Sequence, residues 1–118
     1  MAGERILYVC FDPMLVVERE RSLLDRGYSV QTVLGRDGLM AAKHIDDVEF
    51  IVIGDEGGLS ERQSSVRWLR EEIAEASIIA LCRSNEAVFG ADYQVPTAAP
   101  IACFESLANV IQRRRYSA

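Results

Sequence analysis

Short apolar runs that alternate with helix-type segments place the strongest constraint on the fold of this 118-residue chain. Three runs are almost wholly apolar and of strand length, over residues 6–10, 50–53 and 77–82. A strand that is apolar on both faces is typical of a parallel sheet that helices cover on both sides. Parallel neighbours need right-handed crossover connections, which are usually helices. The sequence therefore predicts a doubly wound α/β fold.

Turn and capping residues place the other elements and give five strand–helix units. Asp12 is a good N-cap and Pro13 suits a first helical turn, so the first helix is predicted over 13–26. Ser60 and Gln63 have the spacing of a capping box, which predicts the start of the third helix. The remaining predicted elements are strands over 28–33 and 91–95, a short helix over 38–45 and a last helix from Pro100.

The charge and hydropathy of the chain argue against nucleic-acid and membrane binding. The formal net charge is −5, whereas phosphate contacts need clustered lysine and arginine. Only 113–115 is locally basic, which suits the end of a helix. No apolar run approaches the roughly 20 residues of a membrane span, and the first residues lack a signal-peptide core. We therefore expect a cytoplasmic protein without direct nucleic-acid or membrane contact.

The cysteines and the single histidine favour no familiar catalytic or metal centre. Cys10, Cys82 and Cys103 are far apart in apolar surroundings, and the chain has no Cys-x-x-Cys motif. Buried reduced thiols are the expected state. His44 lies in a helical stretch, away from any strand end where a Ser/His or Cys/His pair would act.

The carboxyl ends of the strands are where a doubly wound fold binds its ligands. The stretch IVIGDEGGL, residues 51–59, places two acids and two glycines directly after a buried strand. This stretch lacks the glycine spacing of dinucleotide and P-loop fingerprints. The candidate functional residues follow four of the strands, over 10–12, 54–58, 82–84 and 93–96.

Three local motifs resemble the receiver domains of response regulators, the CheY-like family. They are YVCFDP at the first strand, GYSVQTV at the second and GADYQV at the fifth. The resemblance covers nearly the whole chain, so it implies one receiver-like domain over 1–118 with strand order 2-1-3-4-5. It also implies a role in bacterial two-component or phosphorelay signalling. Because 82–90 is several residues shorter than the family's fourth helix requires, we expect that helix to be short or missing.

The chain departs from the chemistry that this resemblance implies. The family uses an acidic pair for Mg²⁺, a phosphoacceptor carboxylate, a Thr or Ser hydroxyl and a lysine. Cys10 and Phe11 hold the acidic-pair positions, which leaves Asp12 as a helix cap. Cys82 replaces the hydroxyl and Pro96 stands at the lysine position. The single lysine of the chain lies in the predicted second helix, away from the strand ends.

The phosphoacceptor position holds a glycine. Counting back from RWLRE, 67–71, places Gly54 there and Asp55 one residue late, with Glu56 following. A shift of one residue turns a side chain to the opposite face of a strand, although a bulge re-aims it. We expect no cofactor, and Mg²⁺ only if Asp55 is functional. Tyr93 matches the family's aromatic switch position, but beside Cys82 it is expected to be a fixed packing residue.

Three functions stay open. The first is a pseudo-receiver that is not an enzyme and acts, without phosphorylation, on a signalling protein or as a homodimer. The second is a phosphorylatable response regulator that uses Asp55. The third is a small ligand-binding protein or thiol enzyme on the same fold. A redox pair of Cys10 and Cys82 is disfavoured because the third strand is expected to separate them.

Overall fold

The computed structural model describes residues 5–43, 45–73, 75–83, 86–96 and 109. Within them, five strands form one parallel sheet in the order β2-β1-β3-β4-β5. This confirms the predicted strand order and direction. The strands are β1 (Arg5–Cys10), β2 (Ser29–Leu34), β3 (Phe50–Ile53), β4 (Ile78–Cys82) and β5 (Tyr93–Pro96).

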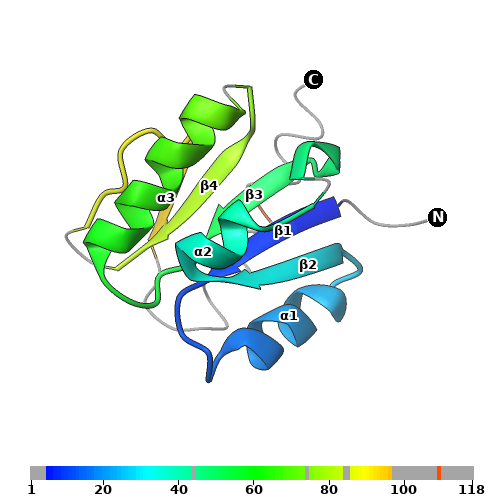
Figure 1. Ribbon diagram of the computed structural model, residues 1–118. Coiled ribbons are helices and arrows are strands. Elements are labelled where there is room, and N and C mark those ends of the chain that lie inside the picture. Colours follow the sequence, from blue (N-terminus) through cyan, green and yellow to red (C-terminus); the bar gives the residue numbers. More distant parts are fainter. Residues whose placement is uncertain (1–4, 44, 74, 84–85, 97–108, 110–118) are drawn as a thin grey trace.

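Helices cover the two faces of the sheet (Figure 1). They are α1 (Val16–Leu24), α2 (Gly35–Met40) and α3 (Leu59–Glu72), with a 3-10 turn η1 (Ile45–Asp47) before β3. Leu23 of α1 packs on one face, with Ile6 and Tyr8 of β1. Leu39 of α2 and Leu69 of α3 pack on the other face. The doubly wound arrangement therefore follows from strands that are apolar on both sides.

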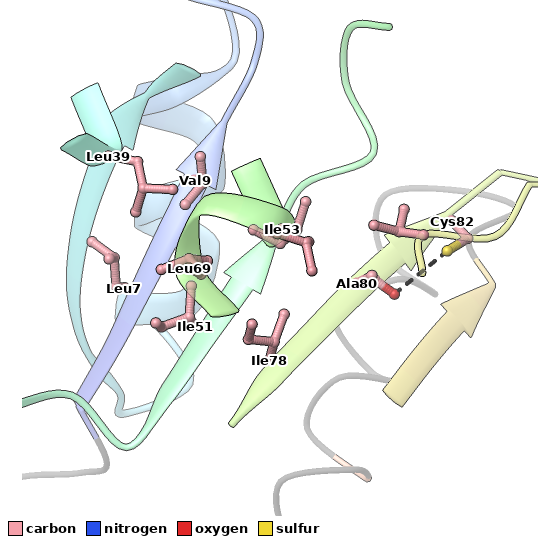
Figure 2. Close-up of a cluster of buried hydrophobic side chains, with 11 residues drawn as sticks. Leu7, Val9, Leu39, Ile51, Ile53, Leu69, Ile78, Ala80 and Cys82 are labelled. Atoms are coloured by element: carbon pink, nitrogen blue, oxygen red, sulfur yellow. Dashed lines mark hydrogen bonds between the residues drawn. The ribbon is translucent and has the colours of Figure 1, made fainter. Parts of the chain in front are cut away.

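The core beneath α3 fixes where the strands end. Side chains from β1, β3 and β4 point to the same side of the sheet and meet Leu69 and Leu39 (Figure 2). Burying each leucine, isoleucine or valine of this cluster contributes about 1.5–3 kcal/mol. The residues of this cluster that the figure labels are Leu7, Val9, Leu39, Ile51, Ile53, Leu69, Ile78, Ala80 and Cys82. Their packing sets β1, β3 and β4 in register, so the residues that follow these strands emerge along one edge.

The first helix is shorter than the predicted 13–26. The Asp12 side chain caps a turn that precedes α1, since its Oδ1 accepts from the Met14 N–H at 2.9 Å. The Asp12 carbonyl accepts from the Leu15 N–H at 3.0 Å, which completes that turn. At the other end Gly27 has φ +90°, a conformation that ends a helix readily only with glycine. Asp12 is therefore a turn residue and not the helix N-cap.

The second helix and the capping box were also predicted wrongly. The helix begins at Gly35, where the φ of +66° needs glycine, and ends at Met40 and not near residue 45. Gly58 is the N-cap of α3, and no side chain caps that helix end. Gln63 instead uses both ends of its amide on the Phe89 backbone, at 2.7 and 2.8 Å. This tertiary contact replaces the local one.

The connection from β4 to β5 contains no helix within its described residues, 83 and 86–92, as expected for a short or missing fourth helix. The predicted last helix from Pro100 lies outside the described residues, apart from the helical Asn109. His44 and Cys103 also lie outside them. Among the described helices, none is long and apolar enough to cross a membrane.

Candidate functional site

The ends of β1 and β3 bring the predicted site residues to one edge of the sheet. Val9 lies opposite Ile53 in the parallel register, and the Gly54 N–H donates to the Val9 carbonyl at 2.9 Å. Cys10 is therefore the last residue of β1, and Glu56 follows the neighbouring β3. This placement agrees with the rule that sites of doubly wound folds lie beyond the carboxyl ends of the strands.

Glu56 is the acid that enters the site. Its carboxylate accepts from the Tyr8 hydroxyl at 2.8 Å and from the Phe11 N–H at 3.2 Å. The Arg19 Nε lies 3.2 Å from Glu56 Oε2 and forms an ion pair with it. The Glu56 and Arg19 side chains are 3% and 8% exposed, so the pair is buried. The hydrogen bonds from Tyr8 and Phe11 to the charged carboxylate, together with this ion pair, hold Glu56 in one position.

The absence of a side chain at Gly54 makes room for that carboxylate. A Cβ built on Gly54 would collide with Glu56 Oε1 and would lie 2.9 Å from both Glu56 Cδ and the Tyr8 hydroxyl oxygen. Real Cβ atoms essentially never approach other atoms so closely. The carboxyl group of Glu56 therefore occupies the space that a side chain at position 54 would enter.

Asp55 lies at the margin of the same cluster. Its Oδ1 is 3.9 Å from Arg19 Nη2, and its side chain is 18% exposed. Since β3 ends at Ile53, the strict alternation of a strand no longer fixes the direction of Asp55. Both acids therefore reach the Arg19 guanidinium, and Glu56 makes the closer contact.

Sequence reasoning missed Arg19 and Tyr8. Arg19 lies four residues before the fully buried Leu23, on the inner face of α1. Tyr8 is fully buried in β1 and faces the same side as Leu23. An arginine on the apolar face of a predicted helix needs a buried partner. This charged residue on an otherwise apolar helix face is the sequence signal by which a buried carboxylate partner could have been predicted.

The residues after β1 offer no good Mg²⁺ ligands. Burial, assisted by the nearby Glu56 charge, raises the pKa of the Cys10 thiol to about 11. The thiol stays neutral and donates to the Asp12 carbonyl at 3.3 Å. Mg²⁺ needs oxygen ligands, yet both Glu56 oxygens already face donors and Asp12 closes its turn. Within the described residues, no group of three His, Cys, Asp or Glu side chains is arranged to hold a metal ion.

The end of β4 and the neighbouring β5 form a neutral hydrogen-bonded unit. Cys82 donates from Sγ to Gln94 Oε1 at 2.9 Å, and burial raises the pKa of its thiol. Gln94 Oε1 also accepts from the Val88 N–H at 3.1 Å. Tyr93 is partly buried and packs against the core on the α1 side, while Pro96 is exposed opposite Cys82 in the register. At the positions expected to correspond to the receiver Thr or Ser hydroxyl and lysine ammonium, this chain therefore has the Cys82 thiol and the Pro96 ring.

Cys10 and Cys82 are free thiols on different strands. β3 separates β1 from β4, as expected from the predicted strand order. Adjacent strands lie about 4.7–4.9 Å apart, so two strand spacings exceed the usual Cα separation of a disulfide.

Helix α3 holds the β4–β5 connection in place of a fourth helix. The fully buried Arg62 donates to Glu86 at 2.8 Å, and this hydrogen bond lowers the pKa of the Glu86 carboxyl. Arg70 donates from Nε to the Gly90 carbonyl at 2.7 Å and from Nη2 to Asp92 at 3.0 Å. Between these contacts the Phe89 side chain projects outward and is 77% exposed.

Comparison with known proteins gives a fold and no sequence family. No protein-family model matches the chain, and no curated protein matches it. Many solved structures do match. The response regulator TrrA from Thermotoga maritima, crystallised with Mg²⁺ and BeF, has a TM-score of 0.73 at 19% identity, covering 93% of this chain and 97% of its own. TrrA in complex with the histidine kinase ThkA has a TM-score of 0.74 at 17% identity, covering 93% and 97%.

Two further structures are similar over the same extent. A receiver domain protein from Methanospirillum hungatei has a TM-score of 0.73 at 14% identity, covering 99% of this chain and 100% of its own. The chemotaxis protein CheY4 from Vibrio cholerae has a TM-score of 0.73 at 18% identity, covering 95% and 98%. The chain therefore has the CheY-like receiver fold.

Proposed function

We propose that this chain is a receiver-like domain of two-component signalling that acts through protein contacts and takes up no phosphoryl group. The receiver fold supports the first part of the proposal. The Glu56 carboxylate, held by Tyr8, Phe11 and Arg19 in the space above Gly54, carries the second part. The domain is a binding module and not an enzyme.

The chemistry of phosphoryl transfer supports this reading. A phosphoryl group brings negative charge, which receivers of the familiar type neutralise with a metal ion and a lysine. Each such electrostatic contact is worth several kcal/mol of transition-state stabilisation. Here the acceptor position has no side chain, and the buried Glu56 carboxylate is already paired with Arg19. Releasing Glu56 for reaction would leave the Arg19 charge buried without its closest partner, at a cost of about 3–5 kcal/mol.

The partner in this proposal is a signalling protein. TrrA forms a crystallised complex with the histidine kinase ThkA, so a kinase of that kind is one class of partner. The β4–β5 connection is a candidate surface for contact with such a partner. Gln63 of α3 holds its backbone at Phe89, whose side chain is 77% exposed. Exposed aromatic side chains on a rigid backbone are common binding anchors.

A phosphodonor experiment tests the proposal. The protein is incubated with acetyl phosphate and Mg²⁺ and its intact mass is measured, beside a conventional receiver as the positive control. We expect the control to gain a phosphoryl group and this chain to remain unmodified. A Mg²⁺-dependent adduct that disappears in Asp55→Asn would favour the phosphorylatable alternative. An adduct that disappears only in Glu56→Gln would identify Glu56 as the acceptor and would also refute the proposal.

The thiol-enzyme alternative has less support. Cys10 and Cys82 are buried, their pKa values are raised, and β3 separates them. A catalytic thiol needs a lowered pKa and access to its substrate. These two cysteines are therefore assigned to the core of the domain.

A further inference from the structure

Arg62 of α3 is a buried cation with unused hydrogen-bond donors. Its side chain is fully buried, and its Nη2 donates to Glu86 Oε2 at 2.8 Å. Its Nε and Nη1 are also buried, and neither has a hydrogen-bond partner among the residues that the structure describes. Buried polar groups in proteins are almost always hydrogen-bonded, because a buried group without a partner is costly. Two unused donors on one buried guanidinium therefore point to a missing acceptor.

The backbone of the β4–β5 connection limits how Glu86 reaches Arg62. The Glu86 N–H donates to the Arg83 carbonyl at 3.1 Å, and Glu86 Oε1 accepts from the Arg83 N–H at 3.2 Å. Glu86 therefore makes its bond to the guanidinium with Oε2 alone. A carboxylate that is free to move binds an arginine best with both oxygens, through two parallel N–H···O bonds.

Both edges of the Arg62 guanidinium offer the second donor for such a bond. Nη2 shares one edge of the planar group with Nε and another edge with Nη1. Glu86 uses only the Nη2 that the two edges have in common. A carboxylate without the tether to Arg83 would gain a second charge-assisted hydrogen bond on either edge.

Glu86 is the member of the pair that reaches solvent. Its side chain is 21% exposed, whereas that of Arg62 is not exposed. A rotation of the Glu86 side chain into solvent would uncover the guanidinium and leave the space of one carboxylate beside it, without a change of backbone. The donors around that space are those of Arg62 and the Arg83 N–H. The position therefore has the donors and the size that a carboxylate needs.

We propose that Arg62 and the Arg83 N–H form a binding site for an external carboxylate, and that Glu86 occupies this site as an internal competitor. The ligand is a carboxylate because the site already holds one. The charge of Asp55, which like those of Arg62 and Glu86 acts on the Cys82 thiol, disfavours a ligand of higher negative charge. The competition with Glu86 weakens the apparent affinity, since only the open fraction of the molecules binds. The inference does not depend on whether the domain accepts a phosphoryl group.

A titration with sodium acetate, followed by NMR, tests the site. The probes are the Arg62 Nε–H and the Arg83 amide, which should shift together and saturate as acetate displaces Glu86. Sodium chloride at the same ionic strength is the reference and should give no saturable shift. A tetraglutamate peptide at equal carboxylate concentration forms a second arm, and the ligand that saturates first shows whether a small molecule or an acidic protein segment fits better. No saturable shift with either ligand would overturn the proposal.

Three variants test the roles of the two side chains. Glu86→Gln removes the competing charge and should bind acetate several-fold more tightly, whereas Arg62→Gln should give no saturable shift at the Arg83 amide. Arg67→Gln is the matched control, because it removes an equal charge from an exposed position of the same helix and should bind like the unaltered chain. Circular dichroism checks that each variant is folded.

Two results with these variants would refute the proposal. One is an acetate affinity that Glu86→Gln leaves unchanged, since the site would then have no internal competitor. The other is binding that survives in a folded Arg62→Gln. If Arg62→Gln does not fold, the comparison of Glu86→Gln with the unaltered chain decides alone.

Discussion

Replacing Gly54 by alanine tests whether Glu56 occupies the space at that position. Gly54 has an ordinary φ, so its backbone tolerates alanine. If the space beside it were empty, alanine would stabilise the protein by about 0.4–1 kcal/mol through the entropy of the unfolded chain. The added Cβ would instead collide with the Glu56 carboxylate and approach the Tyr8 hydroxyl. The sign of the change therefore distinguishes the two situations.

The magnitude follows from the contacts that Glu56 would lose. To admit the Cβ, the carboxylate has to leave the Tyr8 hydroxyl, the Phe11 N–H and Arg19. Breaking a buried ion pair costs about 3–5 kcal/mol, and the hydrogen bonds are part of the same network and do not add in full. Subtracting the entropic gain leaves a net loss of about 2–4 kcal/mol in the free energy of unfolding.

Urea unfolding followed by circular dichroism measures this loss. Gly38→Ala is the control, because Gly38 lies inside α2 and a Cβ there would make only ordinary contacts with Val33 of β2. Alanine there should stabilise the protein by about 0.5–1 kcal/mol. In a Glu56→Ala background the cost of Gly54→Ala should largely disappear, which completes a double-mutant cycle. A stabilising Gly54→Ala in the unaltered chain, or no coupling in the cycle, would refute the placement of Glu56.

Three further predictions concern the groups around the site. Because burial raises the pKa of Cys10 to about 11 and also raises that of Cys82, both thiols should resist iodoacetamide at neutral pH until denaturant is added; rapid native labelling at either residue, located by mass spectrometry, would be inconsistent with this. Arg62 lowers the pKa of Glu86 below its ordinary 4.5, so the stability that this carboxylate contributes is present above that value and is lost as pH falls through the lower folded pKa. Glu86→Gln should therefore be less stable than the unaltered chain at neutral pH and should approach it in acid, as urea titrations at several pH values would show; a constant difference would argue against the pair. Gln63→Ala should speed amide hydrogen exchange at Phe89, whose N–H it removes from a 2.8 Å hydrogen bond, and equal exchange in both proteins would mean that the bond does not hold the segment.

The sheet could be predicted because its strands carry a simple repeated signal. Apolar runs on both faces indicate a parallel sheet, and the order follows once the chain resembles a known fold. The helix ends were predicted less accurately, because the residues expected to cap the helices form other hydrogen bonds in the structure. Gln63 bonds the Phe89 backbone across the fold, and Asp12 closes a turn before α1.

The site was predicted in part. Sequence alone located the edge of the sheet, the missing side chain at position 54 and the acids that follow it. It did not distinguish Glu56 from Asp55, because that choice depends on Arg19 and Tyr8, which lie far away in the sequence. Alternation along a strand predicts only the direction in which a side chain leaves the backbone. The position of the Glu56 carboxylate depends also on the length of its side chain and on the location of its partners.

The most direct test of the central claim is a titration with Mg²⁺ and beryllofluoride, an analogue of a phosphoryl group, followed by amide NMR. TrrA has been crystallised with these ions, so it serves as the positive control. The amide of Phe11 is a sensitive probe because it donates to the Glu56 carboxylate. We expect the amide chemical shifts of Phe11, Asp55 and Glu56 to stay unchanged at all concentrations of the ions. Saturable shifts at Asp55 and Glu56 that require both ions would contradict the claim that this site is closed to phosphoryl groups.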